Sequence, residues 1–281
     1  MRSELLRRSP GLVVALHALA FWPVWRWYLA RTTDGSDEPW GIAALIAALV
    51  LTWPVDRRLR LEEKDPLLVA AIALTLLYGV LVPFAPPLVR SIIGMAALAC
   101  SWITISGTRS KAPVIVALFV LSVPVIASMQ FYAGYPLRAI TTTVATTMLN
   151  VFGMGVDHSG TTMTWQGRSV LVDAPCSGVR MLWAGAFLAC LLAAQRAAVS
   201  WRGLAWVLLS VLPITIAANT IRAALLFVLE TRATPPPQYL HSLVGVGAFA
   251  LAGVSLLAIE VLARQRVAKV PATRYASLRL R

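Results

Sequence analysis

Charged residues are scarce in this chain. Only 13% of the 281 residues are charged, whereas 58% are hydrophobic and the mean hydropathy is +0.74. Soluble domains rarely combine such values. No polar stretch is long enough to build a core of its own, which excludes a separate soluble domain. The sequence therefore predicts an all-α, polytopic membrane helical bundle that forms a single membrane domain over residues 1–281.

Residues that ligate metals are also few. The chain has three histidines and three cysteines, and no two of them lie close together in the sequence. We therefore predict no metal site and no cofactor. Cys100 and Cys190 fall in the middle of apolar runs and are interpreted as packing residues. The basic excess, 25 Lys and Arg against 12 Asp and Glu, comes without a nucleic-acid recognition motif, so we expect membrane lipids rather than nucleic acid as its partner.

Long apolar runs predict about eight transmembrane helices, since about 20 residues cross the hydrocarbon core. The first run lacks a small-residue cleavage site and is expected to be retained. The predicted spans are 11–30, 40–55, 67–84, 88–106, 113–131, 177–195, 203–230 and 242–263. The tight connection at Pro86-Pro87 predicts either a helical hairpin for the third and fourth spans or a boundary between them that lies elsewhere.

The positions of the basic residues predict the orientation. Positive charge gathers in cytoplasmic segments of membrane proteins. Most Lys and Arg residues lie before the first span, after every second span and in the tail 264–281, so both termini are predicted to be cytoplasmic. The cytoplasmic set is Arg2, Arg7, Arg8, Arg57, Arg58, Arg60, Lys64, Arg109, Lys111, Arg196, Arg202, Arg264, Arg266, Lys269, Arg274, Arg279 and Arg281.

This orientation places one long connection, about 132–176, on the external side. Apolar residues recur at helical spacing in 139–152, which predicts an amphipathic helix on the membrane surface. Two β-prone pieces follow, 161–165 and 168–172, around Gln166-Gly167. They could pair as a short β-hairpin or form an ordinary loop.

Three reactive residue types are predicted at the external ends of three different spans. Cys176 lies at the start of the sixth span. Asn219 and Arg222 share one helix face in the outer half of the seventh, where an Arg is costly unless it faces a polar interior. His241 opens the last span. The spacing therefore predicts a polar site on the external side.

These residues resemble the three motifs of the exosortase/archaeosortase membrane transpeptidases, in order. The matching stretches are Pro-Cys-Ser-Gly-Val-Arg at 175–180, Asn-Thr-Ile-Arg at 219–222, and His241. The resemblance covers about 130–263, the predicted catalytic half. Pro175 stands where Ala is frequent in such motifs. The resemblance implies a cysteine protease or transpeptidase with Cys176, Arg222 and His241 as its catalytic residues.

The chemistry of each residue type fits the role that the resemblance implies. A helix start and nearby cations favour the thiolate that acyl transfer by Cys176 needs. An imidazole at 241 can take the thiol proton and later protonate the leaving amine. A fixed guanidinium at 222 can stabilise an oxyanion. Supporting roles are predicted for Arg180, Asn219, Asp173, Ser177 and Gly178. Arg180 could be a second donor to the oxyanion or to the thiolate. Asp173 could orient the histidine or cap the helix.

Each site residue has an alternative interpretation. Arg222 could form an ion pair with Glu230 or Asp173, and His241 could be an interfacial capping residue, with His158 as the competing imidazole. His17 is interpreted as packing. At the level of the whole chain, a transporter or flippase for an anionic envelope precursor is a second hypothesis. A non-catalytic scaffold for envelope polysaccharide assembly is a third.

The resemblance also implies the partners and the cellular place. Its substrates would be exported proteins with a C-terminal sorting signal made of a short motif, a membrane helix and a basic tail. A thioester intermediate would pass to water or to another acceptor nucleophile, two outcomes that the sequence leaves open. The chain would lie in the cytoplasmic membrane of a prokaryote with its active site on the external side.

Overall fold

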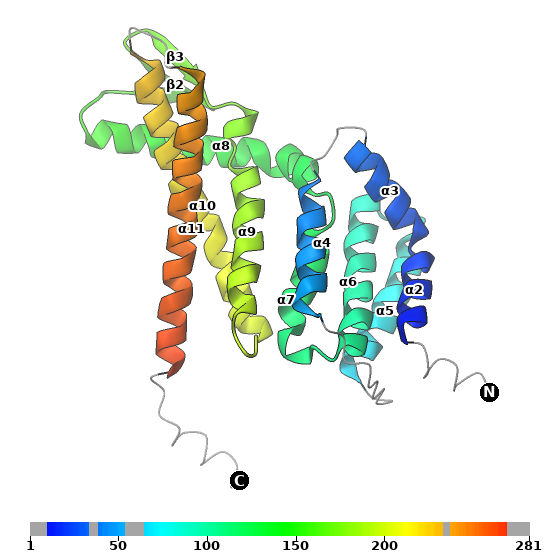
Figure 1. Ribbon diagram of the computed structural model, residues 1–281. Coiled ribbons are helices and arrows are strands. Elements are labelled where there is room, and N and C mark those ends of the chain that lie inside the picture. Colours follow the sequence, from blue (N-terminus) through cyan, green and yellow to red (C-terminus); the bar gives the residue numbers. More distant parts are fainter. Residues whose placement is uncertain (1–9, 34–38, 54–64, 233–236, 269–281) are drawn as a thin grey trace, which may run out of the picture. The chain divides into compact units, whose positions relative to one another are not determined.

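The computed structural model describes residues 10–33, 39–53, 65–232 and 237–268. These residues are mostly helical, with one small sheet, and they divide into two compact units (Figure 1). Unit 1 comprises residues 1–133 and 193–204, and unit 2 comprises 134–192 and 205–281. All of the predicted site residues belong to unit 2.

Unit 1 is built from antiparallel helices. Its elements are α2 (Pro10–Ala20), α3 (Trp22–Thr33), α4 (Trp40–Leu51), α5 (Pro66–Leu81), α6 (Pro87–Ser106), the 3-10 turn η1 (Arg109–Lys111), α7 (Ala112–Leu121) and the start of α8 (Ile126–Val151). The helices α5 and α6 form the hairpin predicted at Pro86-Pro87. His17 bonds Ser101 and Thr75 through its two ring nitrogens, each at 2.9 Å, so it is a satisfied packing residue as interpreted.

The structure does not confirm the prediction of about eight spans. Within the described residues, four helices are long and apolar enough to cross a membrane: Pro87–Ser106, Ala174–Ala194, Trp201–Glu230 and Tyr239–Leu262. A fifth span is present if Arg109–Leu121 and Ile126–Val151, which are bent by 89°, are counted as one broken span. The helices α4 and α5 have 12 and 16 residues, about 18 and 24 Å, which falls short of a hydrocarbon core of about 30 Å. The predicted first span is interrupted at Phe21, between α2 and α3.

The predicted fifth span, 113–131, is wrong in its second half. The helix α7 ends at Leu121, and the chain bends by 89° before α8 begins at Ile126. Pro124 lies in this break, where its ring cannot continue the helix of the preceding turn. The amphipathic helix predicted for 139–152 is therefore the second half of α8, which also contains Pro136.

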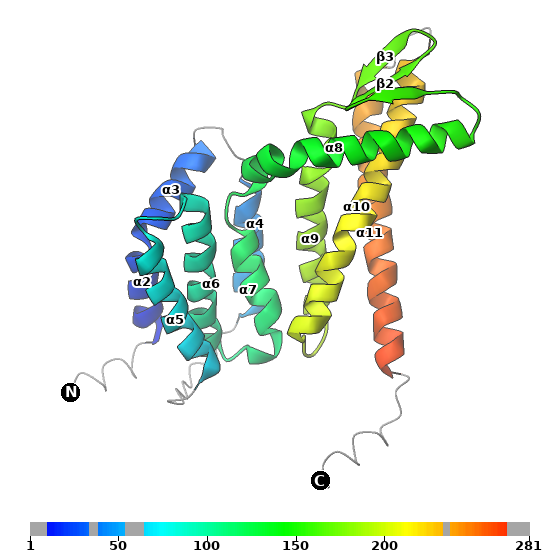
Figure 2. The same ribbon diagram turned by 180° about the vertical axis from the view of Figure 1, so that it is seen from behind.

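Unit 2 consists of the rest of α8, a small sheet and three long helices (Figure 2). The strands are β1 (Asp157–Ser159), β2 (Thr162–Trp165) and β3 (Arg168–Leu171), followed by the 3-10 turn η2 (Ala174–Cys176). The helices are α9 (Val179–Ala194), α10 (Trp201–Glu230) and α11 (Gln238–Ala268). Within this unit, α8 and the sheet lie at the end where α9 and α11 begin and α10 ends.

The three helices of unit 2 pack through small residues. Ala218 on α10 lies in one buried cluster with Ala248 and Ala252 on α11. A Cβ on Gly185 of α9 would lie 2.8 Å from a methyl carbon of Val211, so only glycine allows this approach. Small residues at helix contacts are typical of membrane bundles, where close backbone approach replaces the hydrophobic driving force.

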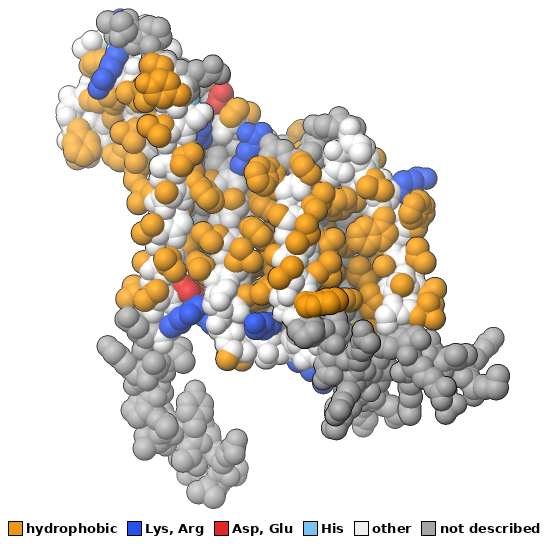
Figure 3. All heavy atoms as spheres, in the orientation of Figure 1, with side chains coloured by type: hydrophobic (Ala, Val, Ile, Leu, Met, Phe, Trp, Pro, Cys, Tyr) orange, Lys and Arg blue, Asp and Glu red, His pale blue; other side chains and the backbone are white. Residues whose placement is uncertain are grey.

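The outer flanks of the helices are apolar. Hydrophobic side chains cover the sides of the helices in Figure 3, while Lys and Arg side chains lie near helix ends. The apolar part of α11 is buried to only 17%, and its Val246 and Val254 are 67% and 64% exposed. Such a surface is stable in lipid and not in water, so the chain is an integral membrane protein.

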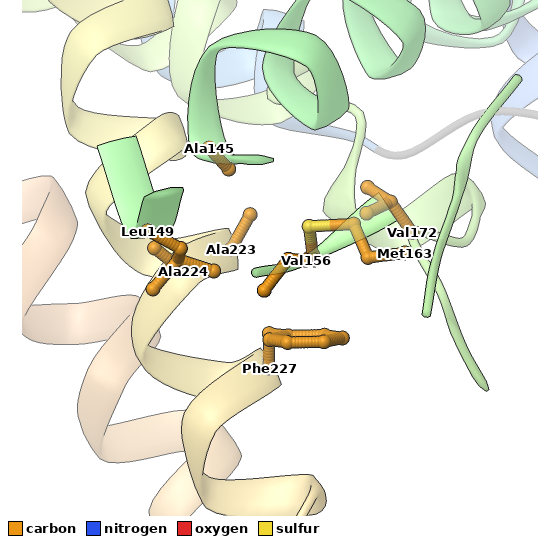
Figure 4. Close-up of a cluster of buried hydrophobic side chains, with 8 residues drawn as sticks. All are labelled: Ala145, Leu149, Val156, Met163, Val172, Ala223, Ala224 and Phe227. Atoms are coloured by element: carbon orange, nitrogen blue, oxygen red, sulfur yellow. The ribbon is translucent and has the colours of Figure 1, made fainter. Parts of the chain in front are cut away.

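The sheet is held against α8 and α10 by a buried apolar cluster. Figure 4 shows side chains from α8, the sheet region and α10 directed toward one another, with Phe227 and Met163 at 0% and 1% exposure. The full cluster is Ala145, Leu149, Val156, Met163, Val172, Ala223, Ala224 and Phe227. Cys176 packs against its edge. The cluster therefore ties the cysteine turn to α10.

Candidate active site

The segment that carries Cys176 is a sharp turn between the sheet and α9. The strand β3 runs into Val172, whose N–H donates to the Thr161 carbonyl at 2.8 Å, and η2 follows. Ser177 then accepts from the Val179 N–H at 3.3 Å, which caps the start of α9. Cys176 is half-buried and lies in η2, ahead of α9 rather than in its first turn.

Gly178 makes this turn possible. Its φ of +80° is a conformation that side chains with a Cβ rarely adopt. A Cβ there would also lie 3.3 Å from Cγ and from Nδ2 of Asn219. The glycine is therefore needed both for the backbone angle and for the approach of α10.

Asn219 joins three elements at the cysteine. Its Nδ2 donates to the carbonyl of Cys176 at 2.8 Å and to Oγ1 of Thr141 on α8 at 3.2 Å. The side chain is buried, at 2% exposure, so these bonds are shielded from water. Asn219 thereby fixes the backbone of the cysteine from α10.

Arg222 follows one turn later on the same face of α10. One of its terminal nitrogens lies 3.5 Å from the carbonyl of Pro175, directly before the cysteine. Its Nε is buried and has no partner among the described residues. A Cβ on Gly245 of α11 would lie 3.6 Å from this Nε, so α11 approaches the guanidinium to within van der Waals contact at this position. An unpaired buried donor beside a cysteine can accept an oxyanion as its partner.

His241 is held by a carboxylate that terminates α10. Its Nε2 lies 3.2 Å from Oε1 of Glu230. The ion pair suggested between Arg222 and Glu230 is therefore not the one found. His241 and Gly245 are four residues apart on α11, which puts the imidazole about one turn from Arg222. No hydrogen bond joins His241 to Cys176 within the described chain.

Three charged side chains act on the Cys176 thiol: Arg222, Asp173 and Glu230. Burial is the largest influence and stabilises the neutral thiol, as the two carboxylates also do, whereas the Arg222 guanidinium stabilises a thiolate. The helix-start setting expected for the thiolate is therefore only partly present, since Cys176 precedes α9 and two anions face it. The remaining requirement is a group that removes the thiol proton.

Among the other predicted residues, Asp173 contacts the cysteine turn directly, because its carbonyl accepts from the Cys176 N–H at 3.0 Å. Asp173 stands at the N-cap position of η2, where its side chain makes no capping hydrogen bond. Arg180 is exposed in the first turn of α9. His158 is exposed on β1, the strand at the opposite edge of the sheet from β3.

Two residues of this site were not predicted from the sequence. Thr141 gives no signal in a Thr-rich segment, because its neighbours are the same residue type. The sequence suggests Glu230 only as an ion-pair partner of Arg222. Its position at the end of α10, before the short connection to His241, is the signal that relates it to the histidine.

A metal ion is held by several His, Cys, Asp or Glu side chains that lie close together. No cluster of three or more His, Cys, Asp or Glu side chains suited to a metal ion exists among the described residues. Cys100 and Cys190 are buried free thiols, as interpreted from their apolar surroundings.

Comparison with known proteins gives a match to a protein family. The model of a family described as "Transmembrane exosortase (Exosortase_EpsH)" matches residues 9–258. This range includes the whole of the site and extends well into the first half of the chain. No curated protein matches the chain significantly, and neither does any solved structure.

Proposed function

Because the chain belongs to the transmembrane exosortase family, we propose that it is a membrane-embedded cysteine transpeptidase or protease acting on exported proteins. The observation that carries this proposal is the convergence of α10 on the cysteine turn. Asn219 and Arg222, one turn apart, contact the carbonyls of Cys176 and Pro175. Such contacts hold a nucleophile beside a fixed cationic donor, which is the arrangement that acyl transfer requires.

The first half of the reaction forms a thioester. His241 takes the proton of the Cys176 thiol as the sulfur attacks the carbonyl carbon of the substrate peptide bond. The resulting oxyanion is stabilised by the Arg222 guanidinium. The C–N bond then breaks, and the imidazolium gives its proton to the leaving amine. Glu230 supports the step by stabilising the charged imidazole.

The second half regenerates the thiol. Water or an amine attacks the thioester carbon while His241 accepts the proton of this nucleophile. The C–S bond breaks and the thiolate recovers its proton from the imidazolium. Water as the acceptor makes the overall reaction a hydrolysis, and an amine makes it a transpeptidation.

The substrate and the location follow from the same proposal. The substrate is an exported protein with a short C-terminal motif, a membrane helix and a basic tail. Its anchor enters from the lipid, with the tail in the cytoplasm. The distribution of Lys and Arg supports cytoplasmic termini and an external site in the cytoplasmic membrane of a prokaryote.

Replacement of the nucleophile tests the function. A reporter protein that ends in a sorting signal is coexpressed with the wild type and with Cys176→Ala. Cleavage of the reporter should disappear in the variant while the protein stays inserted and abundant. Cys190→Ala is the matched control, since this thiol is buried within α9, and it should cleave normally.

A covalent adduct provides the second test. Cys176 in the wild type should carry the reporter fragment through a thioester that hydroxylamine releases. Normal reporter processing by Cys176→Ala would overturn the proposed function.

A further inference from the structure

We propose that the open edge of β3 binds the substrate peptide as an additional strand, so that the sheet delivers the scissile bond to Cys176. This inference rests on the proposed function. The sheet order is β1-β2-β3, so β3 has a neighbouring strand on one side only within the described chain. The ligand is an extended peptide backbone, namely the substrate residues next to the bond that is cut.

The register identifies which backbone groups are open. The two-residue loop between β2 and β3 has Gln166 at φ +47° and Gly167 at φ +75°. Two positive φ values define a primed hairpin turn, in which the flanking residues Trp165 and Arg168 exchange hydrogen bonds. Alternation along β3 then points the N–H and C=O groups of Ser169 outward, away from β2.

The next residues follow the same alternation. The N–H of Val172 donates to the Thr161 carbonyl on the β2 side at 2.8 Å. This bond shows that the backbone groups of Val172 point toward β2 at the end of the strand. Leu171 must therefore direct its N–H and C=O outward, like Ser169. Neither residue donates its N–H to another group in the part of the chain that the structure describes.

This edge lacks the devices that usually block an open strand. Exposed edges are commonly protected by proline, by a charged side chain or by a bulge. The only charged residue on β3 is Arg168, and its guanidinium donates to the carbonyls of Thr231 and Arg232 at the end of α10, at 2.8 and 2.6 Å. At the other end of the strand, Leu171 is 58% exposed. The edge is thus open to an incoming backbone.

The position of the edge explains why the partner is the substrate. Leu171 precedes Cys176 by five residues, so the two are separated by at most about 17 Å of chain. A peptide paired with β3 would carry its scissile bond within about five residues of the paired segment. The opposite edge, β1, has three residues and does not lead to the cysteine.

Side chains of the added strand would have a place to bind. Every second one would point to the face of the sheet that carries Arg168 and Val170. On that side, a cavity of about 430 Å³ lies between the hairpin and the end of α10, lined among others by Trp165, Val228 and Arg232. The backbone pairing would give affinity, and this cavity would select among side chains.

Proline scanning of the edge tests the inference. Ser169→Pro and Leu171→Pro each remove one outward N–H without breaking a backbone hydrogen bond to β2, because Ser169 and Leu171 lie opposite Thr164 and Thr162 in the non-hydrogen-bonded pairs of the ladder. Each proline variant is compared with an alanine variant at the same position. Alanine also removes the native side chain but keeps the backbone N–H. We expect kcat/KM for reporter cleavage to be roughly tenfold lower with proline than with alanine, since one hydrogen bond is lost and the ring obstructs pairing.

Two further measurements keep the inference falsifiable. The alkylation rate of Cys176 by a small thiol reagent should be equal in the proline and alanine variants, which shows that the turn is intact. In a Cys176→Ala background, Leu171→Cys should form a disulfide with a cysteine placed next to the reporter's cleavage site, and Ser159→Cys on β1 should not.

The outcomes separate this inference from the proposed function. Equal cleavage by proline and alanine variants, or equal crosslinking from β1 and β3, overturns the strand addition while the cysteine mechanism stands. Should a proline variant also lose alkylation, the crosslinking result alone decides. Normal cleavage by Cys176→Ala would instead overturn the function itself.

Discussion

Glu230 and His241 face each other across the connection between α10 and α11, with 3.2 Å between Oε1 and Nε2. The carboxylate terminates the helix that carries Asn219 and Arg222, and the imidazole opens the helix whose Gly245 lies against Arg222. The pair therefore couples the orientation of the proposed base to the element that holds the cysteine. A carboxylate in this position fixes the tautomer of a histidine and stabilises its charged form.

We expect Glu230→Gln to lower kcat for reporter cleavage by roughly ten- to a hundredfold with little change in KM, because the imidazolium loses its counter-charge while its hydrogen bond is kept. Glu230→Ala should be more severe. Cleavage rates at several substrate concentrations in detergent or proteoliposomes separate the two constants. A rise in KM alone would show that Glu230 binds substrate instead of positioning His241.

Arg222→Lys is expected to lower kcat by roughly a hundredfold. Lysine keeps the charge but lacks the planar fork whose Nε is unpaired beside Gly245. Single-turnover formation of the thioester is the measurement. Arg180→Lys, one turn into α9, gives the comparison: an effect as large as that of Arg222→Lys would move the oxyanion role to Arg180.

Gly178→Ala should destabilise the cysteine turn by about 1–2 kcal/mol and slow cleavage, since it combines strain at φ +80° with a 3.3 Å approach to Asn219. Gly153→Ala is the matched control, because Gly153 has φ +81° but no atom within 4 Å of its Cβ position. Thermal unfolding and reporter cleavage are compared for both. Equal loss of cleavage in the two variants would mean that backbone strain, and not the contact with Asn219, is responsible.

Much of this site could be predicted because its residues are rare where they lie. A cysteine flanked by proline, serine and glycine, and an arginine inside an apolar run, are costly unless they have a polar purpose. Asn219 was found by its spacing from Arg222. Glu230 could not be assigned to His241, because the sequence shows only that both lie near helix ends and not which groups meet.

The errors in the fold have two different causes. The composition of an apolar run does not show where a helix bends, so the sequence predicts one span over 113–131 although the chain turns at Pro124. The sequence gives no signal for the strand β1, because this segment lacks apolar residues. Its residues Asp157, His158 and Ser159 are polar and exposed, and they form a strand only because β2 offers a pairing edge.

Asn219→Ala is expected to cost about 1–3 kcal/mol of stability, because the Cys176 carbonyl and the Thr141 hydroxyl both lose a buried donor. Cleavage should fall as the cysteine turn loosens. Asn219→Asp tests the polarity of the contact, since a carboxylate cannot donate to the carbonyl. If the aspartate variant cleaved like the wild type, the hydrogen bond to Cys176 would not be what holds the nucleophile.

Accessibility of the cysteine tests the proposed orientation of the site. A membrane-impermeant maleimide added to intact spheroplasts should label Cys176, because the distribution of positive charges predicts an external position for this end of α9. Cys176→Ala removes the only half-buried thiol and should abolish the labelling, since Cys100 and Cys190 are buried. A reporter cysteine introduced near Arg202, in a predicted cytoplasmic connection, should react only after the membrane is opened. Labelling in the reverse order would invert the topology and place the proposed cleavage in the cytoplasm, where an exported substrate would not meet it.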